Sequence, residues 1–190
     1  MPTITIDETG AHKPKRPTSP PPPKRKPDYS ATVMYKPAEV RPSFSKPITW
    51  VGVDPGGSGA IAAVFQDGLP IWITLDNTDA DVSDWLHDLA SECRIVGAVL
   101  ERVASMPGQG VSSSFKFGAS SGFCRGLLVS HRIAFRLVGP VQWQNAMTCR
   151  TKGDKNITKT MAQRIWPSIK ITHANADALL IAEFCRRTTI

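Results

Sequence analysis

The sequence predicts an α/β protein in which one mixed five-stranded sheet, built from residues 48–190, carries helices on both faces. Three observations lead to this prediction. Short apolar runs separated by tight turns follow one another in residues 48–75, which is typical of a meander of strands. From residue 76 onward, apolar runs alternate with segments of helical spacing. The resulting order of strands and helices is not the strict alternation of a dinucleotide-binding fold.

The first strand is predicted at Ile48–Asp54 and ends in a single acid. Directly after Asp54, the residues Pro55–Gly59 turn the chain. Because this turn has little side-chain bulk, backbone and a large ligand can approach the Asp54 carboxylate closely. The same residues also fit a tight hairpin with a surface acid. A second strand is predicted at residues 60–65 and a third at residues 70–75, with a glycine turn between them.

A second acid stands at the end of another predicted strand. Residues 76–92 are predicted to form a helix, because Val82, Leu86 and Leu89 repeat at helical spacing and six acids form its outer face. Residues 95–100 are a continuous apolar run, as expected of a central strand covered on both faces. This run ends in Glu101.

The remaining elements place a third acid near the start of the last helix. A glycine-containing loop leads to a helix from about residue 111, whose small residues at helical spacing permit close packing against a sheet or a second helix. The sequence then predicts a strand at 133–138, a short helix at 141–147, a polar basic loop at 149–155 and a helix at 157–166. The last helix begins at His173, and Asp177 lies one turn later.

Residues 1–47 are predicted to be a disordered tail ahead of one folded domain, residues 48–190. The tail holds eleven of the sixteen prolines and nine Lys or Arg residues against four acids. Such a composition cannot bury enough apolar surface to fold alone. Its role is open between a non-specific DNA-binding arm, a nuclear address and a plain linker.

The distribution of charge in the domain favours a polyanionic partner. Residues 48–101 contain one Arg against nine acids, whereas residues 102–190 contain thirteen basic residues against three acids. A basic surface of this kind attracts nucleic acid, although a merely soluble basic protein has similar counts.

Other compositional features bound the cellular setting. The four cysteines lack the spacing of a zinc site or a disulfide framework, which fits a reducing compartment. There is no apolar run of membrane-spanning length and no signal-peptide core, so no membrane association is expected. We expect a cytoplasmic protein in a bacterium or a phage-infected cell, or a nuclear or organellar one if the source is eukaryotic.

The three acids suggest a metal site. If the strands that end in Asp54 and Glu101 are neighbours, as right-handed crossovers favour, their carboxylates lie side by side, and the last helix can bring Asp177 over them. Three clustered carboxylates repel one another unless a divalent cation such as Mg²⁺ or Mn²⁺ neutralises them. Two such ions could activate water for hydrolysis of a phosphodiester. His173 shares a helical face with Asp177 and is a candidate metal ligand or proton shuttle, or else a surface residue.

Three motifs resemble a known family. VGVDPGGSGAIAAV, VLERVASMPGQGVSSSFKFG and HANADALLIAEF, in this order and spacing, resemble the RuvC-like Holliday junction resolvases of the ribonuclease H superfamily, most closely the phage-type branch, over about residues 49–187. The resemblance implies a ribonuclease H-like fold, with Asp54, Glu101 and Asp177 as catalytic, metal-binding carboxylates for two Mg²⁺ ions, for which Mn²⁺ substitutes. It also implies a homodimer that cuts both strands of a four-way junction in branched DNA and leaves 5′-phosphate and 3′-hydroxyl ends.

The sequence departs from the family at two positions. Many relatives have an Asp or His three residues before the last acid, but Ala174 stands there, and His173 is one residue earlier. The well-known bacterial resolvases have an aromatic residue three positions after the second acid, where this chain has Ala104. Phe115 or Phe117 could replace it in stacking on an unpaired base, although core packing is an alternative use.

Four lysines are candidates for contact with DNA phosphates. They follow Glu101 in the sequence: Lys116, Lys152, Lys155 and Lys159. Similar enzymes place lysines near the loop at 149–155 beside the scissile phosphate, so Lys155 is the strongest candidate. Each of the four could also be solvated surface.

Three other functions compete with a structure-selective nuclease. The first is a nucleic-acid-binding module of the same fold without turnover. The presence of all three acids argues against it. An actin-like or sugar-kinase ATPase would use the DPGGSG turn for nucleotide, yet that fold needs two such domains, so no nucleotide cofactor is expected. A ribonuclease of the same fold is a further alternative, because fold alone does not determine substrate.

Overall fold

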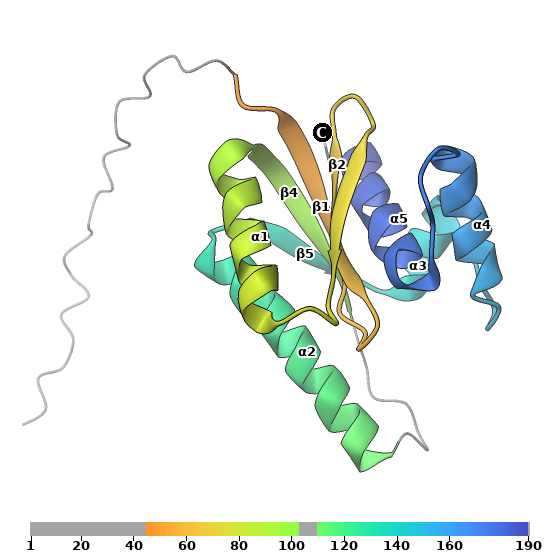
Figure 1. Cartoon of the computed structure of the whole chain (residues 1–190). Coiled ribbons are helices and arrows are strands. Elements are labelled where there is room, and N and C mark those ends of the chain that lie inside the picture. Colours follow the sequence, from red (N-terminus) through yellow and green to blue (C-terminus); the bar gives the residue numbers. More distant parts are fainter. Residues whose placement is uncertain (1–44, 103–109, 190) are drawn as a thin grey trace, which may run out of the picture. The chain divides into compact units, whose positions relative to one another are not determined.

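The computed structural model describes residues 45–102 and 110–189, whose fold is shown in Figure 1. The predicted tail at 1–44 and the predicted glycine loop at 103–109 lie outside the described residues. No helix in the described part is long and apolar enough to cross a membrane. The strands are β1 (Ile48–Asp54), β2 (Ala60–Phe65), β3 (Pro70–Thr74), β4 (Arg94–Glu101) and β5 (Phe135–Val138), and the helices are α1 (Asp79–Glu92), α2 (Val111–Ser130), α3 (Pro140–Ala146), α4 (Asn156–Ile165) and α5 (His173–Thr188).

The five strands form one mixed sheet in the order β3-β2-β1-β4-β5. The first three strands pair antiparallel, while β1 pairs parallel with β4, and β4 pairs parallel with β5. In the register of β1 and β4, Val53 lies opposite Leu100, so these two strands end at the same edge of the sheet. The predicted fold class and the predicted neighbourhood of these strands are confirmed.

Two apolar cores lie on opposite faces of the sheet, because side chains alternate along each strand. On one face, α1 and α2 cover Val51, Val53 and Leu100. On the other, α3, α4 and α5 cover residues such as Val64 and Val99. Figure 1 shows the same division, with α1 and α2 on one side of the strands and the three later helices on the other.

Two element boundaries differ from the prediction by more than one residue, for local reasons. Helix α1 begins at Asp79 rather than at 76, because Thr78 is its N-cap: the Thr78 side chain accepts from the Asp81 N–H, and the Asp81 carboxylate accepts from the Thr78 N–H. Strand β5 begins at Phe135 rather than at 133, because the chain leaving α2 first makes a turn in which Arg132 has a φ of 55°.

Helix α2 extends beyond the sheet (Figure 1). Its buried residues, Cys124, Leu127 and Leu128, all belong to its C-terminal half. The glycines of the predicted small-residue face, Gly118, Gly122 and Gly126, have open space where a Cβ would stand. The close packing that this face permits is therefore not made within the described part of the chain.

Candidate active site

Asp54 is held at the end of β1 by the glycine turn that follows it. The Gly56 N–H donates to Asp54 Oδ1 at 3.0 Å, and the Gly59 N–H donates to the Gly56 carbonyl at 2.9 Å. A Cβ on Gly59 would lie 2.1 Å from the Asp54 carbonyl oxygen, so only glycine fits there. The turn therefore orients the Asp54 carboxylate and keeps side chains away from it, as the sequence predicts.

Glu101 ends β4 beside Asp54 and is held by an aromatic residue. The indole Nε1–H of Trp143, in α3, donates to Glu101 Oε1 at 2.8 Å. Trp143 is completely buried and is among the largest buried side chains in the described chain. One carboxylate oxygen of Glu101 thus has a fixed protein partner.

Asp177 reaches the same edge because α5 packs directly on β1. The N-terminus of α5 is fixed by Asn175, whose Oδ1 accepts from the N–H of the N-cap residue Thr172 at 2.8 Å. Further along, Gly52 of β1 meets the helix backbone: a Cβ there would lie 2.1 Å from the Ala182 nitrogen. This close approach places the first turn of α5, and Asp177 with it, over the end of β1.

The pKa values of the three carboxylates are raised, and two of the carboxylates are raised in part by neighbouring acids. Burial is the largest cause that raises the pKa of Asp54, Glu101 and Asp177 above their ordinary values. The negative charge of Asp177 adds to the effect at Asp54, and the charges of both aspartates add to it at Glu101. Together these effects raise the pKa of Glu101 to about 7, although the Trp143 hydrogen bond acts in the opposite direction.

Two observations test whether this edge suits a cation. Asp177 Oδ1 is buried and has no hydrogen-bond partner among the described residues, and a buried carboxylate oxygen without a partner is costly unless a cation meets it. Within residues 45–102 and 110–189, however, no three His, Cys, Asp or Glu side chains are already gathered as a metal site. The acids fit a divalent ion in charge and chemistry, and they would have to draw together to share it.

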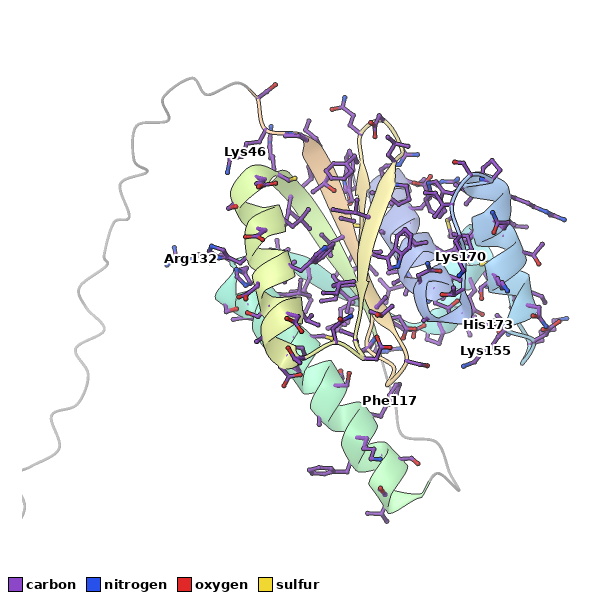
Figure 2. All side chains as sticks on the ribbon, in the orientation of Figure 1. Lys46, Phe117, Arg132, Lys155, Lys170 and His173 are labelled. Carbon is purple, nitrogen blue, oxygen red and sulfur yellow. The ribbon has the colours of Figure 1, made fainter. Side chains whose placement is uncertain are left out.

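Lys155 and His173 are two predicted site residues whose charges act on the acids at this edge. The positive charge of Lys155 lowers the pKa of both Asp54 and Asp177, and the charge of His173 lowers that of Asp177. Figure 2 shows Lys155 and His173 near the start of α5, and both side chains are exposed. Of the four predicted lysines, Lys155 is the one whose charge the structure couples to the acids.

The other predicted DNA contacts are exposed or half-buried. Lys116 and Lys152 are exposed, and Lys159 is half-buried on α4. Phe115 is 77% exposed on the projecting part of α2, so it does not pack into the core formed by the described residues. Ala104 lies outside the described residues.

Sequence reasoning missed three residues that shape the site. Trp143 lies far from Glu101 in sequence, and no spacing rule connects them. Thr158 is buried, and its hydroxyl helps to lower the pKa of Asp177. Gly52 precedes Asp54 by two residues, and an isolated glycine inside a predicted strand was the available signal for close backbone approach.

The raised pKa of Glu101 predicts a pH dependence of stability in metal-free protein. Native protein holds the Glu101 proton up to about pH 7, whereas the unfolded chain loses it near the ordinary value of 4.5. Stability therefore falls as pH rises through this window, by at most about 3 kcal/mol. Urea unfolding in a chelator at pH 5 and pH 8 measures the change. Glu101→Gln should make the loss smaller, while the raised pKa values of Asp54 and Asp177 leave a remainder; an equal loss in wild type and variant would contradict this assignment.

Comparisons with known proteins give a likeness of fold. No protein-family model matches the sequence, and no curated protein matches it. A solved structure of T. thermophilus RuvC in complex with Holliday junction substrate aligns with a TM-score of 0.48 and 17% identity, covering 72% of this chain and 91% of that one. A second Thermus thermophilus RuvC structure aligns with a TM-score of 0.46 and 18% identity, covering 73% and 95%.

Proposed function

We propose that this chain is a divalent-metal-dependent endonuclease that hydrolyses phosphodiesters in branched DNA, with the four-way junction as its substrate. The observation that carries the proposal is the placement of three electrostatically coupled carboxylates, Asp54, Glu101 and Asp177, at one sheet edge beside Lys155. Half-buried acids with raised pKa values, together with an Asp177 oxygen that has no hydrogen-bond partner among the described residues, favour a cation over a hydrogen-bond network.

The three acids would hold Mg²⁺ or Mn²⁺, with two ions per site, and the bound ions would supply an activated water and stabilise the leaving oxygen. Lys155 would contact the scissile phosphate, since its charge already acts on two of the acids. His173 is exposed in the first turn of α5 and would pass a proton between the leaving 3′ oxygen and solvent. The products would carry 5′-phosphate and 3′-hydroxyl ends.

Exposed groups outside the acid cluster would bind the arms of the junction. Lys116, Lys152 and Lys159 would contact backbone phosphates, and Phe115, which is 77% exposed, would stack on an unpaired base. A homodimer would place two active sites on opposing strands. This part of the proposal comes from the sequence motifs, and the mass of the protein in solution tests it.

The deciding experiment incubates full-length protein and Mg²⁺ or Mn²⁺ with end-labelled substrates: a four-way junction, a three-way junction, a linear duplex and an RNA–DNA hybrid. Paired, symmetric nicks in the junction that are absent from duplex would support the proposal. Tight junction binding without cleavage under either metal would point instead to a binding module. Preferential cutting of the hybrid would point to a ribonuclease.

The basic tail is expected to strengthen DNA binding without contributing to the fold. Deletion of residues 1–45 removes eight Lys or Arg residues but leaves Lys46, whose ammonium donates to the Ser91 carbonyl. We expect weaker junction binding and a shallower salt dependence. The slope of the logarithm of the binding constant against the logarithm of the salt concentration should become less negative by roughly 0.9 for each lost phosphate contact. A chain with a Gly/Ser tail of equal length is the control. An unchanged slope in both variants would identify the tail as a linker.

A further inference from the structure

The side chain of Trp143 ends against the carboxylate of Glu101 in the core of the protein. Its Nε1–H donates to Oε1 at 2.8 Å, and its side chain is 0% exposed. An indole N–H can donate a hydrogen bond but cannot accept one. In this contact Trp143 is therefore the donor, and the Glu101 carboxylate oxygen is the acceptor. Removing either partner would leave the other, a buried donor or a partly buried acceptor, without its hydrogen bond, and this lowers stability.

The chain path fixes this contact from both ends. In the register of β4 and β5, Val138 lies opposite Glu101, so β5 ends level with the acid. Gly139 then caps α3, Pro140 begins it, and Trp143 follows within the first turn. Trp143 also packs in the core cluster shared with α4 and α5, which removes its freedom to turn away. Its N–H is therefore aimed at the end of β4 by the fold itself.

We propose that Trp143 is a positioning residue for metal binding by Glu101. The indole holds Oε1 and fixes the rotamer of the carboxylate, which leaves Oε2 as the oxygen that meets the metal ions. The inference rests on the proposed function, because it assigns Trp143 the task of orienting one of the three metal-binding acids. Partners that orient a ligand in this way affect metal affinity although they never touch the metal.

The chain offers a matched control in Trp166. Its Nε1–H donates at the same distance, 2.8 Å, but to the Gly68 carbonyl, and it is also buried in the cluster with α4 and α5. Trp143→Phe and Trp166→Phe therefore remove the same donor and similar volume from one core. By calorimetric titration with Mn²⁺, Trp143→Phe should weaken binding about 10- to 100-fold, whereas Trp166→Phe should leave it unchanged. Equal effects in the two variants would reduce Trp143 to a packing residue.

Two further measurements separate positioning from a general loss of structure. In ¹⁵N-labelled wild-type protein, the indole N–H resonances of Trp143 and Trp166 are assigned by their absence from the Trp143→Phe and Trp166→Phe variants. Mn²⁺ should broaden the Trp143 resonance but not the Trp166 resonance. In a Glu101→Gln background, Trp143→Phe should add less to the loss of Mn²⁺ affinity than it does in wild type, because the two residues act as one unit. Full additivity, or broadening of both resonances alike, would overturn the inference.

The outcomes also distinguish this inference from the proposed function. If Mn²⁺ binding weakens only in Trp143→Phe while wild-type protein cuts no substrate, the positioning role stands and the nuclease assignment fails. If wild-type protein cuts junctions and Trp143→Phe binds Mn²⁺ and cuts as wild type does, the nuclease stands and the positioning role fails. Absence of Mn²⁺ binding by wild-type protein would overturn both.

Discussion

Asp54→Asn is expected to abolish junction cleavage while junction binding is retained or improved. The substitution keeps an Oδ1 acceptor for the Gly56 N–H, so the glycine turn should fold as before. It removes a buried negative charge that would bind metal, and the resulting loss of catalysis should be about a thousandfold or more. Because the same charge opposes an incoming phosphate, its removal favours binding. Single-turnover cleavage and binding titrations on one labelled junction measure both effects.

Asp67→Asn is the matched control for this substitution. Asp67 lies in the turn between β2 and β3, at the opposite end of the sheet, and its Oδ1 accepts from the Leu69 N–H. Its change to Asn removes the same charge and keeps the same kind of backbone contact. Cleavage should persist in this variant. If Asp54→Asn also cleaved at the wild-type rate, the metal-site assignment would be wrong.

The sequence was sufficient to predict the elements that carry the acids. Asp54 and Glu101 each follow an apolar run with the length of a buried strand. The end of each run correctly predicts that β1 ends at Asp54 and β4 at Glu101. Right-handed crossovers favour these strands as neighbours, and the observed strand order confirms it. Local pattern and chain connectivity thus predict where two of the three acids lie, without any knowledge of side-chain packing.

Contacts between distant segments could not be predicted in this way. The hydrogen bond from Trp143 joins positions 42 residues apart, and it exists because β5 and α3 return the chain to the end of β4. The exposure of Phe115 likewise depends on how far α2 extends past the sheet, which its periodicity does not reveal. Helical spacing indicates which residues share a face, but not whether another element covers that face.

The structure predicts that Gly52→Ala disrupts both stability and the site. A Cβ at this position would lie 2.1 Å from the Ala182 nitrogen and 2.5 Å from the Ala178 carbonyl oxygen, and backbone atoms cannot rotate away as a side chain can. Helix α5 must then separate from β1, at a cost of about 3 kcal/mol or more. Urea unfolding should show this loss, and cleavage should fall as well, because Asp177 moves with the helix.

Gly97→Ala provides the comparison that isolates this close approach. Gly97 is also a strand glycine, in β4, but a Cβ there would meet only the Ala134 carbonyl oxygen at 3.9 Å, an ordinary contact. Alanine is favoured over glycine within a strand by roughly 0.5–1 kcal/mol, so this variant should be as stable as wild type or slightly more so. If the two variants unfolded at the same urea concentration, Gly52 would not set the distance between α5 and the sheet. A selective loss in Gly52→Ala, with cleavage lost in folded protein, would tie the position of Asp177 to this one contact between backbones.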